Sequence, residues 1–234
     1  DDYYLPDRFE KDQKILLADD SVDGVYGAIG VDYESDEART KFHEAGYEYQ
    51  EFLTVSRPVP PEELIDVLFG CHALADGQFS TIAVTVRKSL LERSGIFNER
   101  LRLRQDIHLW RRKAAAGRLV PGSNARPVAI RGVHDANRMT DQREHAKYVD
   151  YWWESLQEWF TDCPHVTPRA WHVFQMAFCA YRIAQRPKWE GRRAFLAYMA
   201  RHPKLAFQPM GFFDLNLFKT FGRNWFTLHL VSAK

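Results

Sequence analysis

The stretch RLRLRQDIHLWRRKAAAG (residues 100–117) places a single carboxylate, Asp106, within a run of basic residues. Nearby arginines on both sides of it include Arg102, Arg104, Arg111 and Arg112. The whole chain has no such excess, because 32 lysines and arginines stand against 31 aspartates and glutamates. A net charge of +1 creates no global field that would draw the protein to nucleic acid or an anionic membrane. Any anion site must therefore be local.

The same stretch predicts a helix that begins near Gln105 and has one apolar stripe facing the core. The stripe is formed by Leu103, Ile107, Trp110 and Ala114. Asp106 would lie beside it, in the first helical turn, where the helix dipole and nearby guanidinium groups favour the ionised carboxylate. Such a carboxylate can act as a general base toward a substrate hydroxyl. The alternative is an ordinary surface acid paired with arginine, as is common on charge-rich helices.

Composition indicates a globular intracellular protein. The 234 residues are 45% hydrophobic, which is enough for a sizeable core. Three cysteines without a CxxC pair support neither a disulfide framework nor a zinc cluster, so a reducing, cytoplasmic setting fits best. No apolar run approaches the roughly 20 residues that span a bilayer, and the first residues are acidic and polar rather than a secretory signal.

Residues 1–140 alternate between strand-like and helix-like segments, which predicts an α/β domain with a mixed sheet. Helices are expected after Pro6, from Pro61 to Gly70, and over residues 88–94 before a stop at Gly95. Strands are expected at residues 24–33, 49–55, 81–86 and 128–131, the last within a loop that starts at Leu119.

Residues 141–234 have a different texture, because they are dense in aromatic residues at helical spacing. We expect a helical, aromatic-rich extension. Its tail, FFDLNLFKTFGRNWFTLHLV (residues 212–231), mixes aromatic and basic residues and suits the core, a contact between copies of the chain, or a membrane-surface helix.

Two further groups of residues could carry chemistry. Asp1 and Asp2 offer the oxygen donors that suit Mg2+ or Mn2+ bridged to a diphosphate, although paired acids at a terminus are usually only solvated. We expect the segment RGVHDANRMT to bring Arg131, His134 and Asn137 into a loop, where a histidine can bind a metal or a phosphate. A lone loop histidine more often does neither.

Four segments, taken in order, resemble the family 2 glycosyltransferases of the GT-A fold. They are DDYYLPDRFEKDQKIL, GVYGAIG, VRKSLLERSGIFNERLRLRQDIHLWRRKAAAG and RGVHDANRMT, and together they cover residues 1–140. The resemblance implies a partial GT-A (Rossmann-like) mixed sheet, followed by the kind of variable C-terminal extension that such enzymes carry. It also implies inverting transfer of a sugar from a nucleotide-diphosphate donor to an acceptor hydroxyl.

The resemblance assigns roles to individual residues. Asp1 matches the last acid of the family's Asp-x-Asp motif and Asp2 the residue after it, while the first acid is absent. His134 matches the histidine that approaches the metal or diphosphate, so Asp1, Asp2 and His134 are the implied ligands of Mg2+ or Mn2+. The family's Glu-Asp pair, which supplies the base, is Gln105-Asp106 here, so the base position is kept and its neighbour has lost its charge.

The remaining implied roles concern binding. Arg104, Arg111, Arg131 and Asn137 are expected on the donor phosphates, where positive charge would stabilise the leaving nucleotide. Gln105 and Trp110 are expected to face the acceptor, a glycan or a lipid-linked molecule. The other arginines of the run are expected to be solvated or paired with Glu99 or Asp106.

About 90 residues of the family's domain, which hold the nucleobase and ribose at the strand ends, have no counterpart ahead of Asp1. The resemblance therefore predicts a fragment or a truncated relative of a transferase. Two functions follow. The first is a metal-dependent glycosyltransferase of cell-surface glycan assembly at the inner face of a membrane. The second is a non-catalytic module that contacts a membrane, a partner or a second copy through its C-terminal helices.

Overall fold

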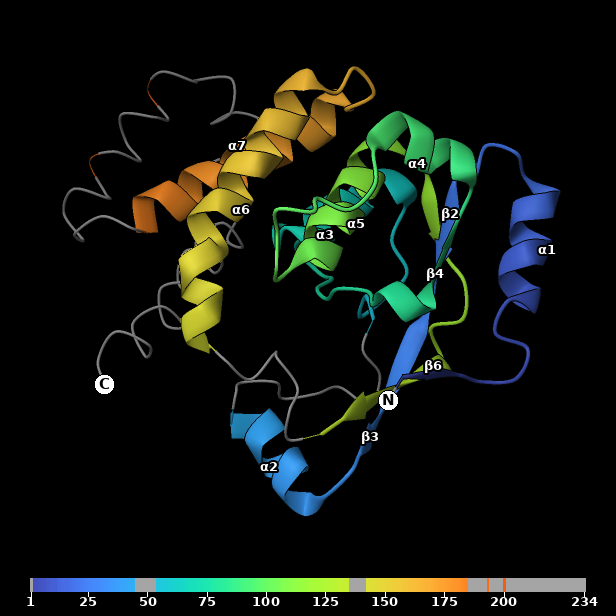
Figure 1. The fold of residues 1–234 in the computed structure, drawn as a ribbon. Coiled ribbons are helices and arrows are strands. Elements are labelled where there is room, and N and C mark those ends of the chain that lie inside the picture. The colour runs from blue at the N-terminus through green and yellow to red at the C-terminus, as the bar shows by residue number, and fades with distance from the viewer. Residues whose placement is uncertain (1, 45–53, 135–141, 185–192, 194–199, 201–234) are drawn as a thin grey trace.

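The computed structural model describes residues 2–44, 54–134 and 142–184, together with positions 193 and 200. This part of the chain is a mixed α/β protein with two small mixed sheets and seven α-helices (Figure 1). The strands are β1 (Tyr3–Tyr4), β2 (Gly24–Tyr26), β3 (Ala28–Tyr33), β4 (Val84–Val86), β5 (Leu119–Pro121) and β6 (Pro127–Val133). The helices are α1 (Glu10–Ala18), α2 (Asp36–Glu44), α3 (Leu64–Leu68), α4 (Lys88–Ser94), α5 (Gln105–Ala116), α6 (Gln142–Asp162) and α7 (Pro168–Ala184). Two 3-10 turns complete the list, η1 (Pro61–Glu63) and η2 (Thr81–Ala83).

Each sheet has three strands and combines parallel with antiparallel pairing. In sheet A, β6 lies in the middle, antiparallel to β1 and parallel to β3. In sheet B, β2 lies in the middle, antiparallel to β4 and parallel to β5. The mixed α/β class expected from the sequence is confirmed.

The expected strand at residues 24–33 is two strands in different sheets. β2 pairs within sheet B and β3 within sheet A, and Gly27 separates them. The Gly27 N–H donates to the carbonyl of Ala83 at 2.8 Å, and its carbonyl accepts from the Thr54 hydroxyl at 3.1 Å. These partners satisfy the Gly27 backbone outside both ladders, which lets the chain pass from one sheet to the other.

The other strand predictions need similar corrections. Only the second half of the segment at 81–86 is a strand, because its first half forms η2. The loop expected from Leu119 contains β5, and the strand expected at 128–131 extends over all of β6. The segment at 49–55 lies mostly outside the described residues, although Val55 forms an antiparallel bridge with Gly77. Such short strands exist through pairing with distant segments, which a local sequence pattern does not reveal.

The helices that were predicted within residues 1–140 are present, but α2 was not among the predictions. α1 follows Pro6, α4 covers the expected residues 88–94, and α5 begins at Gln105. η1 and α3 together fill the stretch from Pro61, and Gly70 and Gly95 follow α3 and α4 with φ of +69° and +79°. Glycine reaches these left-handed conformations at no steric cost, which explains the two helix ends.

The largest core cluster forms where α5 packs among α3, α4 and α6. Figure 1 shows α6 and α7 lying beside α3 and α5, and their aromatic residues belong to the same core. Among the residues of α6 and α7 whose side chains are described, the buried aromatic ones are Trp152, Phe160, Phe174 and Phe178. The expected boundary at 140/141 and the aromatic tail at 212–231 lie outside the described residues.

Helical structure after residue 141 is confirmed by α6 and α7. Within the described ranges, no helix combines the length and the apolar character needed to cross a membrane.

Candidate active site

The residue just before α5 has an unusual backbone conformation. Arg104, which precedes the helix, has φ +57° and ψ 21°, in the left-handed region. A residue with a Cβ pays about 1–2 kcal/mol for this conformation. Two donors hold the Arg104 carbonyl, the His108 backbone N–H at 2.9 Å and the Trp152 indole N–H at 3.1 Å. The start of α5 is therefore fixed by a contact from α6.

Asp106 lies in the first turn of α5 and is half-buried. One of its carboxylate oxygens, Oδ1, accepts a hydrogen bond from the Ile107 backbone N–H at 2.8 Å. Among the described residues, Asp106 forms no ion pair, so the ordinary pairing with arginine that we considered as the alternative is not found there. The carboxylate lies in the first turn of α5, at the positive end of the helix dipole.

Arg111 caps the C-terminal end of α3. Its guanidinium donates from Nε and Nη2 to the carbonyl of Leu68, the last residue of α3, at 2.9 and 2.6 Å. It also lies over the rings of Phe69 and Trp152, 4.4 and 4.8 Å from their centroids. Burial, together with the charge of Arg104, lowers the pKa of Arg111 to about 9, so it is still protonated at neutral pH. These contacts give Arg111 a structural role, because it caps α3 and stacks on two aromatic rings.

Arg112 and Lys113 close the end of α4 in the same way. Arg112 donates to the carbonyls of Ser94 and Ile96, and Lys113 donates to the Gly95 carbonyl and, at 2.8 Å, to the Ser94 hydroxyl. Cations suit the carbonyls at a helix C-terminus, which carry partial negative charge. The expectation that Arg112 is solvated or paired with an acid is wrong, because only 5% of it is exposed and it binds carbonyls.

Lys113 is fully buried. Burial first, and then the charges of Arg112 and Arg93, lowers the pKa of Lys113 to about 7. The basic run thus serves largely to cap α3 and α4 from the central helix. Sequence reasoning missed this role, although the glycines that end both helices, Gly70 and Gly95, signalled carbonyls in need of donors.

His108 connects α5 to α6. Its Nε2 lies 3.0 Å from the Ser155 hydroxyl, and that hydroxyl donates its single proton to the Trp152 carbonyl at 3.0 Å. Nε2 must therefore carry the imidazole proton. Burial, with the charges of Arg112 and Arg111, lowers the pKa of His108 to about 3, so the ring is neutral. A neutral ring with a bare Nδ1 fits the absence of a described partner for that atom.

The other residues expected near Asp106 lie in different environments. Gln105 is half-buried at the first position of α5, and the Arg104 side chain is exposed. Trp110 is only 5% exposed and donates its indole N–H to the Thr81 hydroxyl at 3.2 Å. Little of the Trp110 surface is therefore exposed for contact with a sugar-accepting molecule. The Trp110 contact nevertheless links α5 to η2, which packs on sheet A.

Three of the residues expected on the donor side, Asp2, Arg131 and His134, lie at one end of sheet A. Asp2 Oδ1 accepts a hydrogen bond from the Gly132 backbone N–H at 3.2 Å, so Asp2 lies beside the end of β6. Arg131 belongs to this end of β6 and lies over the ring of Phe42 at 5.9 Å, and His134 follows the strand. Asp1 and Asn137 lie outside the described residues. Within the described part, Asp106 makes no hydrogen bond with Asp2, Arg131 or His134.

The metal prediction is not supported by a complete donor set. In the described residues, no three histidine, cysteine, aspartate or glutamate side chains come together in a way that could hold a metal ion. Asp2 also uses one oxygen for the Gly132 N–H. Since Asp1 lies outside this part of the chain, binding of Mg2+ or Mn2+ by Asp1, Asp2 and His134 stays a prediction.

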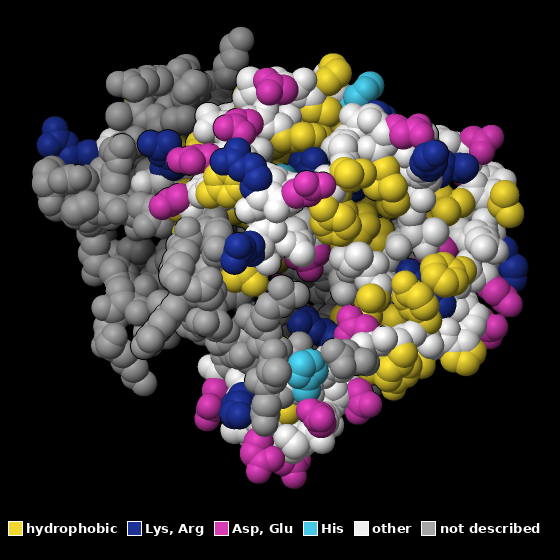
Figure 2. All heavy atoms as spheres, in the orientation of Figure 1, with side chains coloured by type: hydrophobic (Ala, Val, Ile, Leu, Met, Phe, Trp, Pro, Cys, Tyr) yellow, Lys and Arg dark blue, Asp and Glu magenta, His cyan; other side chains and the backbone are white. Residues whose placement is uncertain are grey.

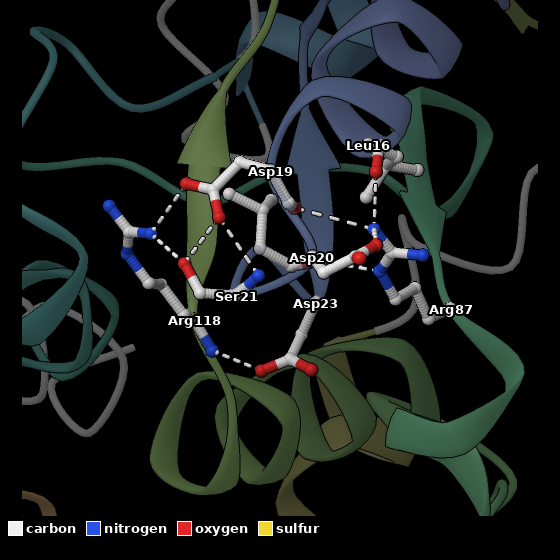
Figure 3. Close-up of polar contacts among 8 residues, drawn as sticks. Leu16, Asp19, Asp20, Ser21, Asp23, Arg87 and Arg118 are labelled. Atoms are coloured by element: carbon white, nitrogen blue, oxygen red, sulfur yellow. Dashed lines mark hydrogen bonds and ion pairs between the residues drawn. The ribbon is translucent and has the colours of Figure 1, made fainter.

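A second polar cluster lies at the turns that connect α1 to β2 and α5 to β5 (Figure 3). The Asp19 carboxylate accepts from the Ser21 hydroxyl at 2.6 Å and pairs with Arg118 at 3.0 Å. Asp23 accepts from the Arg118 backbone N–H at 2.7 Å, and Arg87 donates to the Leu16 carbonyl. Hydrogen bonds from Ser21, followed by Arg118, lower the pKa of Asp19. The residues of this second polar cluster bind one another, so the cluster stabilises the two turns against each other.

No family model matches the chain, and neither a curated protein nor a solved structure does. The candidate site therefore rests on the chemistry and geometry of its residues. Its strongest member is Asp106, whose carboxylate forms no ion pair with an arginine among the described residues, while the neighbouring cations bind helix ends.

Proposed function

We propose that the protein is an inverting glycosyltransferase that moves a sugar from a nucleotide-diphosphate donor to an acceptor hydroxyl, with Asp106 as the general base. One observation carries the proposal. Asp106 is the acid in a run of arginines, yet Arg111 and Arg112 bind carbonyls and leave its carboxylate without an ion pair in the described residues. A half-buried, unneutralised carboxylate at a helix start suits proton abstraction better than structural pairing.

In the proposed reaction, the acceptor oxygen attacks the anomeric carbon while the Asp106 carboxylate takes the hydroxyl proton. The bond from the anomeric carbon to the diphosphate oxygen breaks, and its electron pair leaves with the nucleotide diphosphate. Attack from the face opposite the leaving group inverts the anomeric centre. Holding acceptor and base in line supplies most of the advantage, because it removes the entropy cost of bringing them together.

The donor phosphates would lie toward the exposed Arg104 side chain and toward the end of sheet A that carries Asp2, Arg131 and His134. Positive charge there would stabilise the departing diphosphate. The mixed sheets and the order of β and α elements agree with a partial GT-A fold, which we propose as the finer description of residues 1–140. The helices after residue 141 would be its extension.

The test is Asp106→Asn in the full-length natural protein, with Asp36→Asn as the matched control, since Asp36 is an exposed acid in the first turn of α2. Release of nucleotide diphosphate is measured with a panel of nucleotide sugars in the presence of Mg2+ or Mn2+. We expect Asp106→Asn to lower kcat by about 10²–10⁴-fold and the control to match the wild type. Full activity of Asp106→Asn would remove this mechanism.

The second candidate is a non-catalytic interaction module. Tyr3, Tyr4 and Phe9 are 49%, 56% and 42% exposed around the edge strand β1. Figure 2 shows apolar side chains gathered on the side of the molecule where α1 and sheet A lie in Figure 1. A soluble monomer in gel filtration, with no retention on floated liposomes, would speak against this candidate.

A further inference from the structure

We propose that Trp152 of α6 is a positioning residue for Asp106, an inference that rests on the proposed function. The Trp152 indole N–H holds the Arg104 carbonyl at 3.1 Å, directly before the helix that carries Asp106. Trp152 does not touch the reacting atoms in this proposal. It acts by keeping the first turn of α5 in place.

The Arg104 carbonyl is the point at which α5 begins. It accepts the His108 N–H, the first hydrogen bond of the helix, and its second lone pair is available for the indole. Arg104 has a positive φ, which is strained for a residue with a Cβ. Such a residue returns readily to a negative φ unless other contacts hold its backbone. Without the indole donor, we expect the Arg104 backbone to leave its left-handed conformation and the first turn of α5 to fray. The Asp106 carboxylate would then no longer point in the direction that the proposed reaction requires.

α6 supplies a second indole donor that serves as a comparison. The Trp159 N–H binds the carbonyl of Ser94, the last residue of α4, at 3.1 Å. The two indoles therefore hold the two ends of the connection between α4 and α5. Only the Trp152 contact adjoins Asp106. Comparing the two tryptophans therefore distinguishes a role in positioning Asp106 from a role in packing α6 against the rest of the fold.

The substitution Trp152→Phe is selective. The ring of Trp152 lies under the Arg111 guanidinium at 4.8 Å and meets the His108 ring at 6.2 Å between centroids. Phenylalanine keeps an aromatic ring at that position and removes the N–H. Trp159→Phe removes the same donor from the same helix, and its ring lies 5.7 Å from the Arg112 guanidinium.

The first experiment measures amide hydrogen exchange at single residues by NMR. We expect Trp152→Phe to speed exchange of the His108 amide by about tenfold, with little change at Ala115 near the other end of α5. Trp159→Phe should leave the His108 amide unchanged. Equal His108 exchange in wild type and Trp152→Phe, or the same increase in both variants, would overturn the inference.

The second experiment measures sugar transfer by the same proteins. We expect Trp152→Phe to lower kcat by about tenfold because the base is misaligned, with a donor KM within about twofold of the wild type. Trp159→Phe should keep the wild-type kcat. If the wild type transfers no sugar, the proposed function fails, and the exchange measurement still decides whether Trp152 holds the start of α5. An equal kcat in all three active proteins would overturn the positioning role.

Discussion

The Arg111 guanidinium donates two hydrogen bonds to the Leu68 carbonyl, at 2.9 and 2.6 Å, across 43 positions of sequence. This pair explains why a basic residue lies in the interior of the molecule. α3 ends at Leu68, and its last carbonyls need donors that the helix cannot supply. Through Arg111, α5 provides two such donors.

Arg111→Lys should destabilise the fold. A lysine has one point charge where Arg111 offers two donors to one carbonyl and a flat group for the rings of Phe69 and Trp152. We expect the free energy of unfolding in urea to fall by about 1–3 kcal/mol. Arg102→Lys, at an exposed position of the same run, should change it by less than about 0.5 kcal/mol. Unchanged stability with lost sugar transfer would instead assign Arg111 to the donor phosphates.

Lys113 should make stability depend on pH above neutrality. Burial and the neighbouring cations lower its pKa to about 7 from 10.5, so the unfolded chain binds more protons than the folded one between these values. The free energy of unfolding should therefore rise with pH from 7 to 9, by up to about 1.4 kcal/mol per pH unit. The measurement compares urea unfolding of wild type and Lys113→Met. Identical slopes in the two proteins would contradict a lowered pKa of Lys113.

His108 should make stability fall in acid. Burial lowers its pKa to about 3 from 6.5, so below pH 6.5 the unfolded chain takes up a proton that the folded chain does not. Stability should decrease between pH 6 and 4, by up to about 1.4 kcal/mol per pH unit. His108→Gln should lose this component of the pH dependence, whereas His43→Gln, at an exposed position on α2, should keep it. The same acid sensitivity in wild type and His108→Gln would rule out the assignment.

Two glycines with positive φ should tolerate alanine to different degrees. At Gly70, with φ +69°, an added Cβ meets nothing within 4 Å, so Gly70→Ala should cost only the backbone conformation, about 1 kcal/mol. At Gly77, with φ +122°, the Cβ would lie 2.2 Å from the Thr54 carbonyl oxygen. Gly77→Ala should cost more than about 2 kcal/mol in thermal unfolding. Equal losses would show that the Thr54 backbone moves aside freely.

The sequence predicted α1, α3, α4 and α5 because their signals are local, whereas α2 was not predicted. Pro6 before α1, Gly70 after α3 and Gly95 after α4 act on residues within one turn of themselves. The strand predictions were less accurate. Nothing local distinguishes the β2–β3 segment from one continuous strand, because the division at Gly27 depends on partners at Ala83 and Thr54.

For the candidate site, the sequence identified Asp106 and its place in the first turn of a helix, since both follow from spacing along one element. It did not identify Trp152, whose contact with Arg104 joins residues 48 positions apart. It also assigned Arg111 to a phosphate and Trp110 to an acceptor, whereas both side chains make contacts inside the fold. Those roles stay predictions without support from these contacts.

The sequence alone determined that a helix follows Pro6 and that helices end before Gly70 and Gly95, because proline and glycine act on the backbone of their near neighbours. Tertiary structure decided which strands share a sheet and which acceptors the cations of α5 bind. A guanidinium binds whatever carbonyl the packing brings to it, and for Arg111 and Arg112 those carbonyls end helices elsewhere in the chain. That choice leaves the Asp106 carboxylate without an arginine partner in the described residues, and it could not be seen from residues 100–117 alone.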